Sequence, residues 1–401
     1  MEIFLKYLSE GLLGWPLWAH FVYLAVAVHC TILAVTLYLH RDQTHRGVDL
    51  HPVVRHVFRF WLWLTTGMVT RKWVAVHRKH HAKCETEEDP HSPQVEGLRK
   101  VLLEGAELYR KEANDPETVA KYGRGAPDDW IERHLYSRFP VLGVSLLLVI
   151  SLVLLGGLGA SVWAMQMIAI PFFAAGVVNG LGHYWGYRNF ECPDAATNIT
   201  PVGFLLCGEE LHNNHHAFPS SAKFALRRWE LDWGWVWLRV FSAVGLARIR
   251  RVAPTPVLAR GEEAQRVDLE TVHAVIVNRY HVLHAYTRMV TLPALREAIQ
   301  NRGRRFMRRA KRVLVREPDL LDDRHRTHLD RLLNRYESLG TVFEYREALK
   351  QIWRKATSND QLIQQFRDWC AQAEATGNRH LQAFVQRLRA YRLPDDQTQP
   401  A

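Results

Sequence analysis

Two long stretches of the chain carry no charged side chain. Residues 11–40 and 139–187 contain no Asp, Glu, Lys or Arg, whereas a helix needs only about 20 apolar residues to cross a bilayer. The sequence GGLGA at 156–160 supplies a turn that divides the second stretch into two halves of spanning length. We therefore predict about three spans: one from about Pro16 to Leu39, and a hairpin of two over 139–187.

Tryptophan and charge occur together in two shorter apolar segments. Residues 53–73 include Trp61, Trp63 and Trp73 among several arginines, and residues 229–246 hold four tryptophans and three charged residues. This combination is typical of helices that lie at the membrane surface and do not cross it. We predict interfacial helices in both segments.

The remaining chain is polar, and its apolar residues recur at a helical period. Residues 82–138 carry turn signals and predict a cytoplasmic insertion of short helices, and residues 251–401 predict a basic helical region. The expected fold class is all-α: an integral membrane helical protein with about three spans, interfacial helices and a helical cytoplasmic cap and tail. We expect two domains, a membrane domain over 1–250 and a cytoplasmic region over 251–401.

Charge supports this division and indicates an orientation. The net charge is +11, and residues 251–401 contain 27 Lys and Arg against 18 Asp and Glu, which places +9 in the tail. Basic segments beside membrane spans stay on the cytoplasmic side, so we expect the tail in the cytoplasm. The five cysteines form no CxxC pair, which argues against a disulfide scaffold and against a thiolate zinc site.

Histidine is the residue type that points to chemistry. The chain has 21 histidines, and three groups have regular spacing: HRDQTH at 40–45, HRKHH at 77–81 and HNNHH at 212–216. On a helix, positions i, i+3 and i+4 share a face, so each HxxHH sequence is expected to bring three imidazoles together. His40 and His45 are five residues apart and do not share a face of an α-helix, so one of them is expected on a turn beyond the helix end.

Topology allows these groups to meet in one site. His40 ends the first span, and the hairpin over 139–187 leaves one side of the membrane and returns to it. All three groups then lie on the same side, provided that residues 53–73 do not cross. Asn179 and His183, an i, i+4 pair at the end of the hairpin, join the set because polar groups at the end of a span usually have a function.

The candidate ligands are nine histidines and one asparagine. They are His40, His45, His77, His80, His81, Asn179, His183, His212, His215 and His216. One first-row ion rarely takes more than six ligands, so this set indicates two metals, and we favour a dinuclear iron centre, although imidazole also suits zinc, copper and nickel. His91 is expected to be a turn residue and not a ligand. Glu209, beside the third group, either orients an imidazole or caps or solvates the segment.

The ordered sequences HRDQTHR, HRKHH, NGLGH and GEELHNNHHAFP resemble those of the integral-membrane fatty acid desaturases. The resemblance covers roughly residues 15–250 and is to the stearoyl (delta-9) acyl-CoA desaturase branch and its bacterial relatives. It implies a non-haem di-iron site held by the nine histidines, with Asn179 contributing directly or through water. It also implies an acyl chain in a kinked apolar tunnel that passes the metals, with Trp73 lining the substrate region.

The resemblance further implies a reaction and its partners. The reaction is the oxygen-dependent introduction of a cis double bond, at delta-9, into a saturated fatty acyl chain carried by CoA or by a lipid. The cofactors are two iron ions, with dioxygen as co-substrate. His51 and Pro52 are followed by Val-Val and not by the paired glycines of a fused cytochrome domain, so electrons are expected from a separate NAD(P)H-dependent reductase or ferredoxin-type chain. The expected location is a bacterial inner membrane, with the metal site cytoplasmic.

Two other functions would also use a cluster of histidines. A fatty acyl hydroxylase would use the same metal site, whereas a metal transporter or sensor would need polar residues along its spans, and residues 139–178 offer almost none.

The run RGRRFMRRAKR at 302–312 has seven basic residues in eleven. It is either a solvated helix face or a site for anionic lipid or an acidic electron carrier, and nucleic acid is not expected as a partner.

Overall fold

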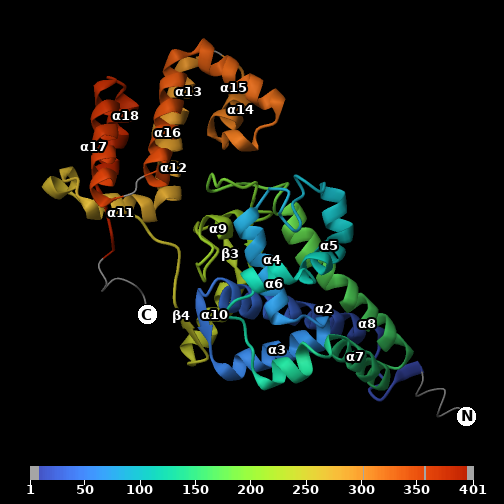
Figure 1. The fold of residues 1–401 in the computed structure, drawn as a ribbon. Coiled ribbons are helices and arrows are strands. Elements are labelled where there is room, and N and C mark those ends of the chain that lie inside the picture. Colours follow the sequence, from blue (N-terminus) through green and yellow to red (C-terminus); the bar gives the residue numbers. More distant parts are fainter. Residues whose placement is uncertain (1–8, 301, 356–357, 395–401) are drawn as a thin grey trace, which may run out of the picture. The chain divides into compact units, whose positions relative to one another are not determined.

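Two compact units make up the part of the chain that the structure describes. The computed structural model describes residues 9–300, 302–355 and 358–394. Unit 1 comprises the residues up to Arg188 together with Asp194–Ala253, and unit 2 comprises Asn189–Pro193 together with the chain from Pro254 onward. Most of the regular structure is helical, as predicted (Figure 1).

The uncharged stretches form the longest helices of unit 1. Helix α2 (Leu17–Ala34) continues into the π-helix η1 (Val35–Thr44), and α8 (Gly157–Ile170) continues into the π-helix η3 (Pro171–Leu181). These continuous helices, of 28 and 25 residues, are long and apolar enough to cross a membrane. A shorter apolar helix, α7 (Pro140–Leu155), precedes α8. Gly156, with a φ of 63°, reverses the chain between them, within the predicted turn.

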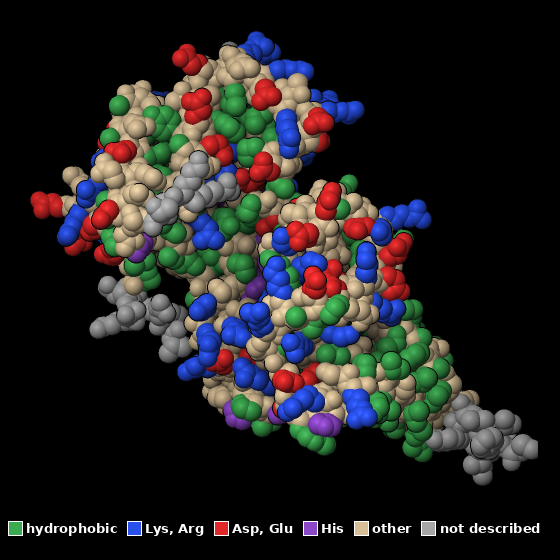
Figure 2. All heavy atoms as spheres, viewed as in Figure 1, with side chains coloured by type: hydrophobic (Ala, Val, Ile, Leu, Met, Phe, Trp, Pro, Cys, Tyr) green, Lys and Arg blue, Asp and Glu red, His purple; other side chains and the backbone are tan. Residues whose placement is uncertain are grey.

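The surface of α7 and α8 is apolar on the outside. Exposed side chains along these helices include Val141, Leu146, Val149, Leu158 and Ile168. Figure 2 shows hydrophobic side chains gathered over the end of unit 1 at which Figure 1 labels α7 and α8. An exposed apolar area of this kind is typical of a surface in contact with lipid or protein.

The other helices of unit 1 are shorter and surround the ends of the spans. They are α3 (Pro52–Thr66), α4 (Thr70–Lys83), α5 (Leu98–Ala113), α6 (Pro116–Tyr122), the π-helical turn η2 (Glu132–Tyr136), α9 (His212–Ala217) and α10 (Trp233–Ala243). The segment predicted as one interfacial helix over 53–73 is instead two helices. Gly67, with a φ of 65°, ends α3, and α4 begins at Thr70.

Short strand pairs tie distant parts of unit 1 together. Strand β1 (Val48–Leu50) pairs antiparallel with β4 (Ala247–Ile249), and β2 (Val202–Gly203) pairs in parallel with β3 (Leu231–Asp232). The first pair joins the chain just after the first histidine group to the end of the unit. These pairings hold the loops around the histidines between the helices.

Helix α5 lies directly against the π-helix η3. A Cβ atom at Gly176 would lie 2.8 Å from the carbonyl oxygen of Leu102, and one at Gly105 would lie 3.0 Å from the backbone of Ala175. Only glycine allows the two backbones to approach this closely. The contact places α5 beside the part of η3 that carries Asn179.

Unit 2 is helical and has its own apolar core. Its elements are β5 (Val257–Leu258), the 3-10 turns η4 (Gly261–Gln265) and η6 (Pro318–Leu320), α11 (Leu269–Val277), α12 (Arg279–Tyr286), the π-turn η5 (Thr287–Thr291), α13 (Leu292–Ala298), α14 (Arg304–Val315), α15 (Asp323–Arg335), α16 (Glu337–Lys355), α17 (Asn359–Ala375), α18 (Arg379–Arg389) and β6 (Tyr391–Arg392). Strands β5 and β6 pair antiparallel. Tyr286, Leu332, Phe366 and Phe384 are among the buried core residues.

Candidate metal centre

His40 and His45 lie at the end of the first span helix. The last turns of this helix are π-helical, and the His45 backbone N–H donates to the His40 carbonyl oxygen 3.1 Å away. Because i to i+5 bonding gives a π-helix more residues per turn than an α-helix, residues five apart lie nearer to one face, and the two imidazole centroids are 4.9 Å apart. His45 does follow the last helical residue, as expected. The expectation that the pair would not share a face assumed α-helical geometry and is wrong.

The HRKHH sequence lies on α4, and its three histidines do not converge on one point. An α-helix advances about 100° per residue, so relative to His77 the i+4 residue is displaced by about 40° in one direction and the i+3 residue by about 60° in the other. His77 and His81 accordingly stay together, with their Nε2 atoms 3.1 Å apart. His80 points into a second group of histidines.

Helix α9 divides its histidines in the same way. His212 and His216, whose ring centroids are 4.5 Å apart, face the second group. His215 faces the first group, and its Nε2 atom lies 2.9 Å from that of His81. The expectation that each HxxHH sequence brings three imidazoles together is therefore wrong for both helices, because each one contributes to two neighbouring groups.

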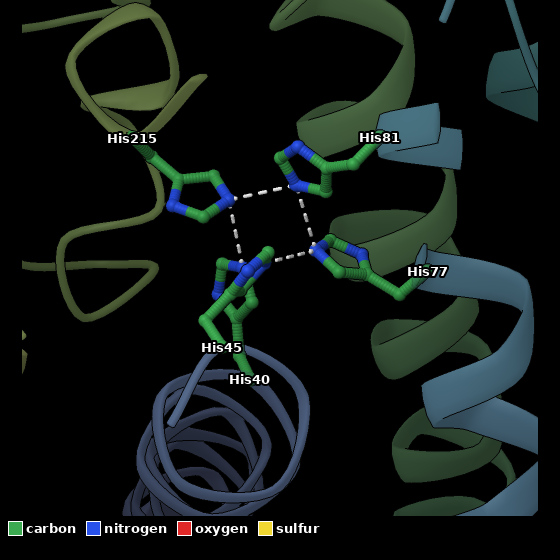
Figure 3. Close-up of side chains that lie close together, drawn as sticks. All are labelled: His40, His45, His77, His81 and His215. Carbon is green, nitrogen blue, oxygen red and sulfur yellow. Dashed lines mark hydrogen bonds between the residues drawn. The ribbon is translucent and has the colours of Figure 1, made fainter. Parts of the chain in front are cut away.

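Five histidines from η1, its C-terminal end, α4 and α9 form the first group (Figure 3). The dashed lines in Figure 3 join their facing Nε2 atoms, in the order His40, His215, His81, His77, His45. The successive distances are 3.0, 2.9, 3.1 and 3.2 Å. All five rings thus present a nitrogen to one small volume.

Four histidines form the second group. The Nε2 atoms of His183 and His212 are 2.9 Å apart. The ring centroids of His80 and His216 lie 4.9 and 4.7 Å from that of His183. The groups adjoin each other, since the rings of His81 and His216 stack with centroids 4.3 Å apart. The structure therefore brings all nine predicted histidines together, five in one group and four in the other.

Carboxylates orient four of the nine imidazoles. The Nδ1 atoms of His40, His80, His183 and His216 face Glu209, Asp89, Glu85 and Asp194 at 2.7, 2.9, 2.8 and 3.2 Å respectively. An Nδ1–H that donates to a carboxylate leaves Nε2 as an unprotonated nitrogen and fixes the ring plane. Of the two alternatives for Glu209, the structure favours the orienting role. Its neighbour Glu210 instead accepts the backbone N–H groups of Leu206 and Gly208.

The facing nitrogens fit metal ions. In the first group the facing Nε2 atoms lie 2.9–3.2 Å apart, and any two of them that are both unprotonated repel each other unless a cation lies between them. Imidazole nitrogens bind first-row ions at about 2.0–2.1 Å, so two ligands at right angles are about 3 Å apart, which matches the first group. In the second group, Nε2 of His216 is buried without a hydrogen-bond partner among the described residues. Both observations support the predicted pair of metals.

Burial keeps most of these imidazoles in the form that binds a metal. Desolvation, followed by neighbouring charges, holds the pKa well below its usual value for His45, His77, His81, His212, His215 and His216. At His80 burial also lowers the pKa, but the Asp89 carboxylate outweighs it and raises the pKa overall. Neutral imidazoles can bind an ion without first releasing a proton.

Three residues near the second group were not predicted as part of the site. Cys84, one turn after His80, has its Sγ atom 4.0 Å from His80 Nε2. His91 does lie in a turn, but it is buried, stacks on His80 with centroids 4.4 Å apart, and interacts with Asn179. Asp89 accepts the His91 backbone N–H. Acidic residues that closely follow HRKHH, such as Glu85 and Asp89, are a sequence signal for carboxylates that could orient the histidines, and our predictions from the sequence did not use it.

An apolar cavity of about 120 Å³ lies beside the first group. His40, His77, His91 and Asn179 contribute to its wall, together with apolar residues of η1, α4, α5 and η3. Trp73, predicted to line the substrate region, also lines this cavity and stacks on His77 with centroids 4.9 Å apart. The wall of this cavity is mostly apolar, and its polar contributors include His40 and His77 of the first group.

A buried arginine within the first histidine sequence supports the framework. Arg41 is 1% exposed and donates to both carboxylate oxygens of Asp232, at 2.9 and 3.1 Å. It also donates to the carbonyl oxygens of Ala222 and Cys207. These bonds join η1 to the segments on either side of the third histidine group, so they fix His40 relative to α9.

Comparisons with known proteins agree with this arrangement. A family model described as fatty acid desaturase matches residues 16–241, more than half of the chain. The chain belongs to the fatty acid desaturase family. As a member of that family it is an oxidoreductase, and the matched residues include both histidine groups.

Similar desaturases occur in plants. Delta-9 acyl-lipid desaturase 2 of Arabidopsis thaliana is 31% identical over 235 residues, which cover 58% of this chain and 73% of the relative. Icosanoyl-CoA 5-desaturase of Limnanthes douglasii is 32% identical over 241 residues, covering 57% and 64%. Acyl-CoA C20 Delta5-desaturase of Anemone leveillei is 30% identical over 250 residues, covering 57% and 72%. Each of these matches covers a little more than half of this chain.

A second family model, described as transposase, matches residues 270–393. This segment lies in unit 2. Among the described residues, the groups of side chains that could hold a metal ion all lie between His40 and His216, in unit 1. The desaturase match therefore falls almost entirely in unit 1, and the transposase match falls in unit 2.

Proposed function

We propose that the chain introduces a cis double bond at the delta-9 position of a saturated fatty acyl chain, carried by CoA or by a lipid, at a di-iron centre. The observation that carries this proposal is the pair of adjacent imidazole groups, the first of which lines an apolar cavity. Two relatives from Arabidopsis thaliana are named delta-9 acyl-lipid desaturases, which supports the position, whereas the Limnanthes and Anemone relatives are named for position 5. The Limnanthes relative is named for acyl-CoA, so both carriers belong in the test.

The proposed ligands follow the two groups. One iron would be held by His40, His45, His77, His81 and His215, and the other by His80, His183, His212 and His216, with Asn179 contributing directly or through water. When bound, these ions would supply the oxidising power, from dioxygen and two external electrons, that removes hydrogen from adjacent methylene groups.

The chain's own residues position the substrate and the imidazoles. Four carboxylates fix the rings of four histidines through Nδ1, so these ligands are preorganised. The carboxylates are Glu209, Asp89, Glu85 and Asp194. Trp73 and the apolar wall hold methylene groups beside His40 and His77. An apolar cavity also excludes water, which restricts reaction to the bound chain.

The proposal includes a location and partners. We place the protein in a bacterial inner membrane, with the metal centre and unit 2 in the cytoplasm, because the tail carries +9 of the net charge. Electrons would come from a separate reductase or ferredoxin-type protein. We assign the reaction to unit 1 and treat unit 2 as an accessory domain.

Expression in a host that lacks monounsaturated fatty acids tests the reaction. Lipids would be analysed by mass spectrometry with localisation of the double bond. We expect a new delta-9 monoene that disappears in a His80→Ala variant. A His134→Ala variant should retain the product, because His134 is exposed on η2, where it bonds to the Trp130 carbonyl oxygen and stacks on the Trp130 ring.

Other products would contradict defined parts of the proposal. A product that gains one oxygen would identify a hydroxylase, and a monoene at another position would overturn delta-9 alone. Membranes supplied with labelled acyl-CoA or labelled phospholipid would show which carrier holds the new double bond. Metal analysis of the purified protein should find two irons per chain and a loss in His80→Ala.

A further inference from the structure

Helix α14 of unit 2 has one apolar face and one cationic face. Ala310, Val313 and Leu314 are buried in the core of the unit. The opposite face carries five exposed arginines, which line one hollow of the surface and are called here the arginine patch: Arg304, Arg305, Arg308, Arg309 and Arg312. Figure 2 shows Lys and Arg side chains on the part of unit 2 where Figure 1 labels α14 and α15.

The arginine patch has no carboxylate partner among the described residues. Other arginines of unit 2 are paired, for example Arg346 with Glu347 and Arg389 with Glu374. In the patch, by contrast, i and i+4 positions are both cationic at 304 and 308, 308 and 312, and 305 and 309. Like charges at this spacing destabilise a helix. An external anion would relieve this repulsion.

We propose that the arginine patch binds the anionic phospholipid headgroups of the membrane in which unit 1 lies. Guanidinium groups bind phosphate oxygens bidentately, and clusters of basic residues beside a span are attracted to anionic lipid. Unit 2 is part of the same chain as the two long apolar helices, so the local concentration of membrane around it is high. The patch would therefore hold unit 2 at the bilayer surface.

The composition of α14 argues against single-stranded nucleic acid, whereas duplex DNA, which the transposase match across α14 brings into question, is left to the test. Single-stranded nucleic acid is bound by exposed aromatic side chains that stack on bases. The aromatic residue of α14, Phe306, and its neighbour Met307 instead pack against the core of unit 2. The same packing leaves no large apolar side chain on the cationic face to insert into a bilayer. We therefore describe the contact as electrostatic and superficial, and it does not depend on desaturation.

Hydrogen exchange of the full-length protein in lipid nanodiscs tests the proposal. Nanodiscs of phosphatidylcholine alone would be compared with nanodiscs that also contain phosphatidylglycerol. We expect exchange in peptides from α14 to slow by at least about threefold in the anionic discs. The difference should vanish at about 1 M salt, where charges are screened within about 3 Å. Peptides from α18 serve as an internal reference.

Two variants of equal charge separate the patch from net charge. The first replaces the five patch arginines with glutamine. The matched control replaces five exposed arginines elsewhere in unit 2, which are Arg260, Arg288, Arg296, Arg324 and Arg335. Only the patch variant should lose the lipid-dependent slowing. A third variant replaces the five patch arginines with lysine, which keeps the charge, and it should retain the lipid-dependent slowing. This variant still tests the proposal if the glutamine variant is unstable.

Three results would overturn the proposal. Exchange of α14 could be equal in the two kinds of disc, or the control variant could lose the effect as fully as the patch variant. A duplex oligonucleotide could slow exchange of α14 where anionic lipid does not, which would identify a nucleic-acid site. None of these results bears on the double-bond assay, so failure here is distinguishable from failure of the proposed desaturation.

Discussion

Glu209 and Glu210 are neighbours in the sequence but have different surroundings. Glu209 accepts the Nδ1–H of His40 at 2.7 Å, and it also accepts the hydroxyl of Thr36. Glu210 accepts backbone N–H groups, and burial raises its pKa to about 7. The first residue therefore orients a proposed ligand, whereas the second stabilises a loop.

A Glu209→Gln substitution should weaken metal binding. The amide oxygen is a poorer acceptor for the imidazole N–H, and changes of such orienting groups cost about 10–100-fold in metal affinity. Competition against a chelator of known affinity would measure the loss. Glu210→Gln is the matched control, and it should keep the affinity for iron while lowering the temperature of unfolding. Equal iron affinity in the two variants would contradict the orienting role.

At the level of residues, spacing in the sequence predicts which histidines come together, but it does not predict which carboxylates contact them. Eight histidines occur in three regularly spaced groups, His183 lies at the end of the hairpin, and all nine lie together in the structure. The carboxylates of Glu85, Asp89 and Asp194 come from loops whose paths no local pattern predicts. His91 illustrates the limit, since its sequence predicts a turn, which it occupies, but not its stacking on His80.

At the level of helices, the sequence predicts the elements but not how they divide the ligands. The uncharged stretches, the turn at Gly156 and the helical tail follow from hydrophobicity and glycine. The π-helical end of the first span does not, because it depends on packing around His40 and His45. Helical geometry allows the three histidines of each HxxHH sequence to face two directions. Their division between two groups could not be predicted from the sequence, because it depends on where the other histidines lie in space.

The close contact of α5 with η3 makes a prediction about glycine. A Cβ at Gly176 would lie 2.8 Å from the Leu102 carbonyl oxygen, whereas one at Gly180 would make ordinary contacts of 3.5 Å with Leu102 and Leu98 side chains. Gly176→Ala should therefore destabilise the protein by about 1–3 kcal/mol, because a tightly packed contact must open.

Thermal unfolding in detergent would measure this effect. Gly180→Ala, one turn along the same helix, is the control and should unfold near the temperature of the unmodified protein. If both alanine variants unfold at the same lower temperature, the loss belongs to the π-helix itself and not to its contact with α5.

At the level of the whole molecule, the two units have separate cores and separate chemistry. The change from an apolar to a basic, charged sequence near residue 250 indicates where the second unit begins. The inclusion of Asn189–Pro193 in unit 2 has no counterpart in the sequence pattern, because it arises from contacts between distant segments. The proposed metal ligands all lie in unit 1.

Removal of iron should therefore loosen unit 1 and leave unit 2 unchanged. An ion that binds only the folded state stabilises it by about 2.7 kcal/mol when present at about 100 times its dissociation constant. Chelation should accelerate hydrogen exchange in η1, α4 and α9, where facing nitrogens would repel each other, while exchange in α17 and α18 stays the same. Reloading with iron should restore the slow exchange, and the His80→Ala variant should recover less of it. Faster exchange in both units on chelation would show that they unfold together, and no change in unit 1 would contradict the assignment of the histidines as ligands.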